Sequence, residues 1–421
     1  MKYMISVCLI CICSSLAAQS ADSVYMPNIQ TVQLYLHGNQ LAYPELSLNG
    51  GDKLNLEFDD LDANAKNYYY TYQLCNADWT PVQISSFDYI RGFAQNPIRD
   101  YTYSSIALTR YTHYHAILPE QGSVITRSGN YLLKVFLDND TSKLAFTKRL
   151  LVVDNAVSIA AQFLQPMNTQ ISQTHQKIQF SINSRALALV NPFQQLKVVL
   201  LQNHRWDNAL YINKPSFYSG SNFEYNSDDV PVFPGGKQWR WLDLQSFRFQ
   251  SDRVAKADYL PKSTTIYVKP DADRSGQPYY YYADYNGAYF IQTTESINPY
   301  YQTDFATVKF SFIPPGNAAL PDQDIYLFGE LTGYKFDDAS RMVFNAQKGI
   351  YEGSAFLKMG FYNYAYVTVN KNDLAPKASF EFTEGNHFET ENDYLILVYY
   401  RSMGGRADEL VGTFSLNTLR Q

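Results

Sequence analysis

Apolar and polar residues alternate at every second position along much of the chain. In the segment VQLYL, the apolar residues Val32, Leu34 and Leu36 are separated by Gln33 and Tyr35. The same alternation recurs in segments 53–60, 130–138, 177–183 and 363–370. Successive side chains of a β-strand point to opposite faces, so this period of two predicts half-buried antiparallel strands with one face in a core.

Short clusters of turn-forming residues lie between these segments. They read LNGGDK, RSGN, LDND, FPGGK, YNGAY and GGR. Glycine, asparagine and aspartate tolerate the backbone conformations that tight turns require. A capped amphipathic helix is hard to find between them. Many short strands joined by such turns predict an all-β chain of tandem immunoglobulin-like or early-set β-sandwich domains.

The length of 421 residues is too great for one ordinary core, and it predicts two or three domains. The stretch VVDNAVSIAAQFLQPMN resembles a last strand that passes into a new domain, so we expect a boundary near Asn155. The connector ESINPYYQTD predicts a second boundary near Asn298. The expected units are an N-terminal sandwich at 19–155, a middle sandwich at 156–298 and a C-terminal early-set sandwich at 299–421.

The first 18 residues have the three-part pattern of a secretory signal peptide. A single cation, Lys2, precedes an apolar run at 4–16, and small residues end at Ala18. The cysteines inside this segment follow Val or Ile, which disfavours a lipid anchor. Cys75 is the one cysteine beyond it, so we expect a mature fold held by burial without disulfides. No later apolar run reaches the roughly 18 residues that cross a bilayer.

The most aromatic stretch, YYYYADYNGAYF, occupies residues 279–290. It contains the pair Asn286-Gly287 between two aromatic runs, which predicts a hairpin with a type I′ turn. Tyrosine rings can pack while their hydroxyl groups reach water, so a structural role explains the composition. A platform for a sugar or a protein partner is the alternative.

Composition and motifs argue against several function classes. The net charge of −6 and the lack of a basic block disfavour nucleic acid as a partner. The chain has no nucleophile elbow, phosphate-binding loop or dinucleotide-binding motif. We therefore expect no enzyme activity, no catalytic residues, no cofactor and no metal.

Three groups of residues are candidates for metal or acid–base sites. His113 and His115 share one face of a strand, which suits a metal, but a half-exposed strand pair explains them better. The segment 271–276 begins like a calcium loop and lacks its later ligands, so a surface turn is expected. The remaining group follows a strand directly and is expected to cap a turn, with acid–base pairing as the alternative; it comprises Asp59, Asp60 and Asp62.

The sharper candidates for a contact site lie in FPGGKQWRWLDL. Trp239 and Trp241 are two positions apart, so on a strand they would face the same way, with Arg240 facing the other way. Two indoles on one face suit a sugar ring or a protein partner. They equally suit a hydrophobic core, and both interpretations stay open.

Several segments together resemble one family, the plug protein of the type IX secretion system of Bacteroidetes. In the first third they are CNADWTPVQISSFDYIRGFAQNPIRDY, YTHYHAILP and SGNYLLKVF. In the middle third they are NPFQQLKVVLLQNHRWDNAL, FPGGKQWRWLD and YYADYNGAYF. In the last third they are IYLFGELTGY, KMGFYNYAYVTV and FETENDYLILVYYR. One small departure is Lys237-Gln238 after the Gly-Gly pair, where the family more often has an acidic or polar residue before an aromatic-Arg pair.

The resemblance implies a function that the residues alone do not. Such plugs are thought to sit in the periplasm and to close the outer-membrane translocon barrel, called SprA or Sov, when no cargo occupies it. It implies contact with the membrane only through that partner, and no obligate homo-oligomer is expected. The last third also resembles the early-set module of glycogen-binding domains, in which a Trp sugar contact follows the turn. Here Tyr334 lies near that place, which weakens the alternative of a periplasmic or surface glycan-binding protein.

Overall fold

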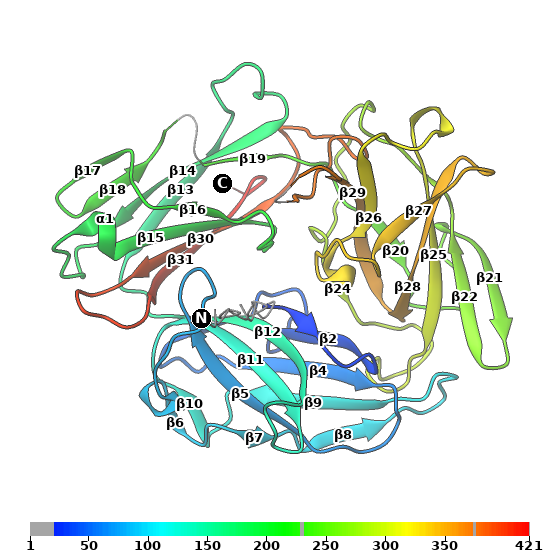
Figure 1. Cartoon of the computed structure of the whole chain (residues 1–421), viewed down its shortest axis with the longest axis horizontal. Helices are drawn as coiled ribbons and strands as arrows, with labels where there is room; N and C mark the ends of the chain where they lie inside the picture. Colours follow the sequence, from blue (N-terminus) through cyan, green and yellow to red (C-terminus); the bar gives the residue numbers. More distant parts are fainter. Residues whose placement is uncertain (1–20, 228–230, 374–375, 421) are drawn as a thin grey trace, which may run out of the picture.

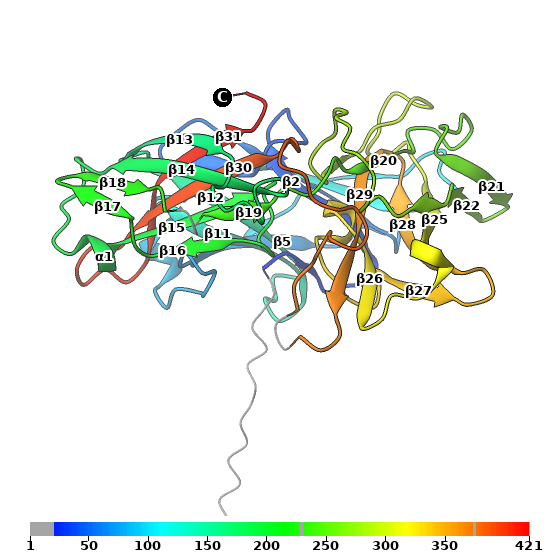
Figure 2. The same ribbon diagram turned by 90° about the horizontal axis from the view of Figure 1, so that it is seen from above.

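Three β-rich lobes surround a common centre in the computed structural model of the chain (Figure 1). The structure describes residues 21–227, 231–373 and 376–420. The expected signal peptide at 1–18 lies outside these residues. Figure 2 shows the body edge-on, and it is flattened along the direction of view of Figure 1. The all-β prediction is confirmed, because strands make up nearly all the regular structure of the described chain.

Lobe I comprises residues 21–154 and is a sandwich of two main sheets. Its elements are β1 (Ser23–Val24), β2 (Ile29–Leu36), β3 (Glu45–Ser47), β4 (Leu54–Asp60), β5 (Tyr68–Cys75), η1 (Ser86–Asp88), β6 (Ile90–Gly92), β7 (Asn96–Pro97), β8 (Asp100–Tyr103), β9 (Thr112–Leu118), β10 (Ser123–Ile125), β11 (Gly129–Leu137) and β12 (Leu144–Val153). One sheet has the order β1-β12-β11-β5-β7, and the other has the order β2-β4-β9-β8. Their facing sides form a core in which the rings of Phe58 and Tyr114 stack 5.0 Å apart.

Lobe II combines the middle of the chain with its last two strands. Its elements are β13 (Ser158–Leu164), β14 (His175–Asn183), α1 (Pro192–Gln195), β15 (Leu196–Gln202), β16 (Leu210–Ile212), β17 (Phe217–Ser219), β18 (Asn222–Tyr225), β19 (Val232–Pro234), β30 (Asp393–Tyr400) and β31 (Glu409–Asn417). The sheet β13-β14-β18-β17 packs on the sheet β16-β15-β30-β31. Strand β15 pairs with β30 along its whole length, from Leu196 opposite Tyr400 to Gln202 opposite Tyr394.

Lobe III is formed by the segment between the two parts of lobe II. Its elements are β20 (Arg240–Asp243), β21 (Val254–Leu260), β22 (Ser263–Val268), β23 (Asp271–Ala272), β24 (Tyr289–Phe290), β25 (Phe305–Ile313), η2 (Pro315–Asn317), β26 (Gln323–Phe328), η3 (Glu330–Thr332), β27 (Arg341–Asn345), β28 (Ile350–Lys358) and β29 (Phe361–Asn370). One sheet runs β20-β29-β26-β27-β28-β25-β22-β21. Leu242 and Ile266, from opposite ends of that order, share one core, so the sheet folds back on itself.

The strand pairing does not follow the expected division at residue 298. Strands β20 to β24 precede that position and pair within lobe III, whereas β30 and β31 follow it and pair within lobe II. The physical reason is that turn residues mark where a strand ends and carry no information about which strand it pairs with. We therefore propose a division in which lobe III is inserted into lobe II, between about residues 236 and 386.

Strand β30 is buried on both faces. Its even-numbered residues Tyr394, Ile396 and Val398 belong to the core of lobe II. The odd-numbered Leu395, Leu397 and Tyr399 pack instead with residues of β11 and β12 in lobe I. A strand covered on both sides loses the apolar–polar alternation, which explains the continuous run YLILVYY. Lobes I and II thus share a hydrophobic interface.

Candidate functional site

Trp239 lies buried where lobes II and III meet, and only 4% of its surface is exposed. Its indole stacks on Phe328 and meets the rings of Phe380 and Tyr334 edge-on. Arg205 of lobe II covers this cluster, with its guanidinium carbon 4.8 Å from the centre of the Phe328 ring. The cluster around Trp239 therefore joins lobes II and III by aromatic and cation–π packing.

The turn at Asn286-Gly287 is shaped to fit the same indole. Both residues have positive φ, 52° and 86°, and the amide of Ala288 donates to the carbonyl of Tyr285 at 2.9 Å. A Cβ atom on Gly287 would lie 2.8 Å from the Trp239 ring. The predicted turn is confirmed, but the predicted hairpin is wrong. Residues 279–284 form no strand, and β24 pairs with β29 instead.

Trp241 belongs to a different aromatic group from Trp239. Strand β20 begins at Arg240, so Trp239 precedes the strand, and the two indoles do not share one platform. The half-buried Trp241 ring stacks on Phe361 at 6.2 Å, and Phe361 stacks on Phe290 at 5.6 Å. Phe361 of β29 therefore stacks with rings from both neighbouring strands, β20 and β24, and all three rings are half-buried.

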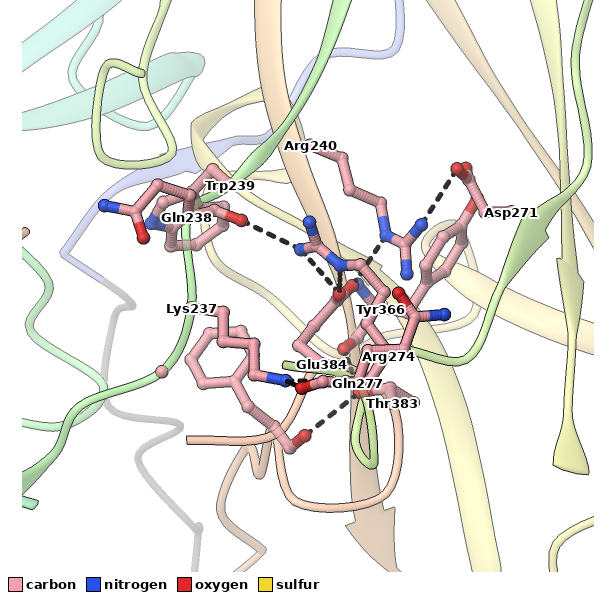
Figure 3. Close-up of polar contacts among 12 residues, drawn as sticks. Lys237, Gln238, Trp239, Arg240, Asp271, Arg274, Gln277, Tyr366, Thr383 and Glu384 are labelled. Carbon is pink, nitrogen blue, oxygen red and sulfur yellow. Dashed lines mark hydrogen bonds and ion pairs between the residues drawn. The ribbon is translucent and has the colours of Figure 1, made fainter. Parts of the chain in front are cut away.

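Arg240 is buried at the centre of an ion network, with 7% of its surface exposed (Figure 3). Its guanidinium donates to Glu384 and to Asp271, each at 2.9 Å. Glu384 is also paired with Arg274 at 2.7 Å, and Asp271 with Arg253. Segment 271–276 is therefore no simple surface turn, because Asp271 is buried and paired with Arg240 and Arg253, which lie 31 and 18 positions before it.

The electrostatics of this network suit a structural role. Burial alone raises the pKa of the Glu384 carboxyl, but the guanidinium groups of Arg240 and Arg274 lower it to about 2. A carboxylate held so firmly in its charged form is a poor proton acceptor near neutral pH. The hydroxyls of Tyr364 and Tyr366 both donate to Asp271 at 2.9 Å, which satisfies its second oxygen.

A second buried ion network joins lobe I to lobe III. His113 contacts Glu57 at 2.9 Å and Asp59 at 2.8 Å through its two ring nitrogens. The ammonium of Lys358, which is 1% exposed, pairs with the other oxygen of Asp59 at 2.7 Å. It also donates to the carbonyl of Tyr300 and lies 4.2 Å from the centre of the Tyr111 ring. His113 is thus a buried ionic partner and not a half-exposed strand residue.

The groups of this second network shift one another's proton affinities. Burial disfavours the charged imidazole, but hydrogen bonds to Asp59 and Glu57 raise the pKa of His113 above its ordinary value. Burial likewise opposes ionisation of Asp59, yet the charge of Lys358 lowers its pKa. Burial lowers the pKa of Lys358. Asp59, Asp60 and Asp62 were predicted to cap a turn. Asp60 does so, because its carboxylate accepts the backbone amide of Asp62 at 3.0 Å.

Asp408 links lobe II to lobe I. Its carboxylate accepts the backbone amide of Ala77 at 3.0 Å and pairs with Lys197 and Arg401. Nearby, the hydroxyl of Tyr399 donates to the side-chain oxygen of Asn130 at 2.7 Å. Buried polar contacts therefore join lobe I to both other lobes, and aromatic and cation–π contacts join lobe II to lobe III.

A central cavity of about 780 Å³ lies where the three lobes converge. Its walls come from all three: Tyr43 and Arg149 of lobe I, His204 of lobe II, and Tyr334 of lobe III among them. Tyr334 is half-buried in the left-handed backbone region, at φ 55°. Of the four residues predicted to contact a partner, Trp239 and Tyr334 lie in one cluster. Arg240 lies in the buried ion network with Asp271 and Glu384, and Trp241 lies in the separate aromatic group with Phe361.

Sequence reasoning missed the partners in the ion networks. Asp59, His113 and Arg240 were singled out, but Lys358, Glu384 and Asp408 were not. Lys358 is 299 positions from Asp59, and Glu384 is 144 positions from Arg240. Lys358 ends β28, a strand that also carries Glu352, so no local pattern in the sequence marks Lys358 as buried.

His, Cys, Asp and Glu side chains in the described part of the chain form no group of three or more placed to hold a metal ion. None of the described helices is long and apolar enough to span a membrane.

Comparisons with known proteins show similarity to a protein family and to solved structures. Residues 29–154 match the family described as "Type 9 secretion system plug protein 1st domain". A crystal structure of a hypothetical protein from Parabacteroides merdae ATCC 43184, at 2.30 Å resolution, is 29% identical and has a TM-score of 0.90. That similarity covers 95% of this chain and 100% of the other. No curated protein matches the chain.

Proposed function

We propose that the chain closes the translocon barrel of the type IX secretion system, because residues 29–154 match the first domain of the plug protein family of that system. In this proposal the protein is a non-enzymatic plug that lies in the periplasm. It contacts the outer membrane only through a barrel of the SprA or Sov kind. The family name describes a plug and not an enzyme. The observation that carries the proposal is the joining of three lobes into one broad body.

Size supports this role for the whole body rather than for one lobe. A compact chain of about 400 residues has a radius of gyration of roughly 21 Å, which corresponds to a sphere ~55 Å across. A barrel of about 36 strands, with strands ~4.8 Å apart and tilted by about 40°, is roughly 70 Å across between backbones. Side chains narrow that opening further. A single sandwich of about 130 residues, roughly 36 Å across, would leave a gap.

Rigidity supports the role as well. A stopper that deformed would leak, so its lobes must hold a constant arrangement. The Asp59–Lys358 pair joins lobes I and III, Asp408 joins lobes I and II, and the Trp239 cluster joins lobes II and III. Buried pairs of this kind add geometric specificity, because each misplacement leaves an unpaired charge away from water.

The predicted contact residues receive different roles in this proposal. Trp239 and Arg240 are buried, so we assign them to positioning of the lobe junction. Trp241 and Tyr334 are half-buried and remain proposed contacts with a partner. The aromatic group of Trp241, Phe361 and Phe290 is half-buried, and aromatic side chains are enriched at protein–protein interfaces.

The test is the permeability of the outer membrane. Deleting the gene should make cells sensitive to large antibiotics that intact outer membranes exclude, because the barrel would stay open. Cells that lack both the protein and the barrel should not show this sensitivity. Unchanged permeability in the single deletion, with the barrel present in the membrane, would contradict the plug. Depletion of the purified protein by a polysaccharide matrix, together with that result, would favour the alternative of a glycan-binding protein.

A further inference from the structure

The three lobe junctions differ in how much apolar surface they share. Lobes I and II share a hydrophobic cluster, in which Leu132 and Leu151 of lobe I pack with Leu397 of lobe II. No hydrophobic cluster of the described residues includes side chains from both lobe I and lobe III. Because buried apolar surface resists exposure to water, lobes I and II hold together as one body, whereas lobe III lacks that attachment to lobe I.

Lobe III meets lobe I mainly through polar groups. The carboxylate of Asp304 in lobe III accepts the backbone amides of Leu108 and Thr109 in lobe I, at 2.8 and 3.0 Å. The backbone amide of Ile291 in lobe III donates to the side-chain oxygen of Gln40 in lobe I at 2.8 Å. These donors and acceptors find equivalent partners in water, so their net contribution to holding the two lobes together is small.

The ion pair of this junction separates at little cost when both partners leave together. Asp59 and Lys358 lose their hydration on burial, and water restores it to both when the lobes part, which offsets their lost attraction. Tyr111 and Phe305 add an aromatic contact, with ring centres 5.4 Å apart, that is small beside the cluster shared by lobes I and II. The junction is therefore rigid while its groups are paired, and it parts as a unit.

Two short connections attach lobe III to lobe II, and they run side by side. One follows β19 through Gly235 and Gly236, and the other leads through Gly385 and His387 to β30. The backbone amide of His387 donates to the carbonyl of Gly236 at 2.8 Å. Gly236 and Gly385 have positive φ, 64° and 80°, and glycine changes its backbone angles at less cost than other residues. The paired connections have the position and the composition of a hinge.

The other contacts between lobes II and III gather beside these connections. Arg205 of lobe II lies over the ring of Phe380, the same ring that a Cβ atom on Gly236 would approach at 3.8 Å. Asn286 donates its side-chain amide at 3.1 Å to Asp393, the first residue of β30. Figure 1 shows the connections to lobe II and the meeting point of lobes I and III at opposite ends of lobe III. A rotation about the connections therefore disturbs their neighbours least and parts lobes I and III most.

We propose that lobe III is a hinged flap, which swings away from lobe I and returns while lobes I and II stay together. Residues 235–236 and 385–387 are the hinge, and the Asp59–Lys358 pair with its polar neighbours is the latch. With the latch closed, the body is the rigid stopper. Opening separates the walls of the central cavity, which all three lobes line. It also changes the outline of the body and so releases the plug from the barrel, a step that rests on the proposed function.

Hydrogen exchange of the purified full-length mature protein measures the opening. The buried amide of Ile291 donates to Gln40 across the junction of lobes I and III. The buried amide of Ala77 donates to Asp408 across the junction of lobes I and II. After correction for intrinsic rates, we expect Ile291 to exchange at least about tenfold faster than Ala77. Equal protection at the two amides, or a less protected Ala77, would overturn the flap.

A cross-link distinguishes lobe opening from a local fluctuation. In Ser105→Cys/Tyr301→Cys the thiols lie where the Ser105 amide donates to the Tyr301 carbonyl at 2.8 Å, so a short bismaleimide holds the latch closed. The native cysteine of the described chain is buried. This bridge should slow exchange at Ile291 at least about tenfold. The matched control, Glu45→Cys/Thr413→Cys, bridges lobes I and II and should leave Ile291 unchanged. Exchange at Ile291 that the first bridge does not slow would contradict the proposal.

Cells test whether the flap releases the plug. A disulfide in Ser105→Cys/Tyr301→Cys, verified by gel mobility, should keep the outer membrane sealed and lower secretion through the barrel severalfold. The control pair Glu45→Cys/Thr413→Cys should secrete normally. Normal secretion with the first disulfide formed would overturn release by the flap and leave the plug standing. The permeability of the gene deletion tests the plug by itself, so failure of this proposal and failure of the plug can be told apart.

Discussion

The ammonium of Lys358 lies 2.7 Å from a carboxylate oxygen of Asp59, although 299 positions of the chain separate the two residues. Both side chains are buried, and the pair joins the end of β28 in lobe III to β4 in lobe I. The contact ties together two lobes whose cores are otherwise separate.

Removal of the Lys358 ammonium group should strongly destabilise the protein. Lys358→Met leaves Asp59 charged and buried beside fewer donors, which costs about 3 to 5 kcal/mol of unfolding free energy. Chemical denaturation with intrinsic fluorescence measures the change. Lys348→Met is the matched control, because Lys348 pairs with Glu352 at the surface, and it should cost less than about 1 kcal/mol. Equal losses in the two variants would contradict a buried ionic lobe junction.

Acid should weaken the junction around Arg240. The pKa of Glu384 is lowered from its ordinary value of 4.5 to about 2, so its contribution is present above pH 4.5 and is lost as pH falls through about 2. The shift corresponds to about 3 kcal/mol. Unfolding free energy measured between pH 6 and pH 2 should fall accordingly.

Glu384→Gln should remove most of that acid dependence and be less stable at pH 7, where Arg240 loses one of its two charged partners. Glu381→Gln, an exposed neighbour on the same loop, should keep the wild-type dependence. An identical acid slope in wild type and Glu384→Gln would show that other carboxylates dominate the acid response.

Alkaline pH should weaken the contacts of His113. Its pKa in the folded protein is raised above 6.5 by Asp59 and Glu57 against the opposing effect of burial. The contribution is therefore complete below pH 6.5 and is lost as pH rises through the raised folded value. Titration of the His113 ring by NMR gives the folded pKa directly. In His113→Gln, the loss of stability above pH 6.5 should become smaller; an unchanged loss would rule out His113 as its source.

The two tryptophans of FPGGKQWRW should respond differently to truncation. Trp239→Ala empties the space between Phe328, Phe380 and Gly287 and should cost about 3 to 5 kcal/mol. Trp241→Ala removes a half-buried ring and should cost clearly less. Thermal unfolding of both variants compares them, and pull-down of the barrel from solubilised outer membranes measures partner capture. If Trp241→Ala retains both stability and partner capture, Trp241 is not a partner contact.

Local sequence by itself determined the class of the fold and many of its strands. The alternating segments at 53–60, 130–138, 177–183 and 363–370 coincide with β4, β11, β14 and β29. The turn at Asn286-Gly287 could also be predicted from these two residues alone, because both tolerate positive φ. The alternation of side chains marks the strands, and the conformations open to two residues mark the turn, and such information is local. The predicted burial of a single face is wrong for β4, β11 and β29, which are buried on both faces.

Only the tertiary structure decided which strands pair and which charges meet. Strand β30 pairs with β15 across an inserted lobe, and the pairing depends on complementary faces that no turn signal specifies. Lys358, Glu384 and Asp408 look like ordinary surface charges in the sequence. Their burial is stable only because Asp59, Arg240 and Lys197 arrive from distant segments, and that compensation exists only once the chain has folded. For the same reason, Trp239 and Trp241 separate into two environments, since one indole belongs to a lobe junction and the other to a sheet surface.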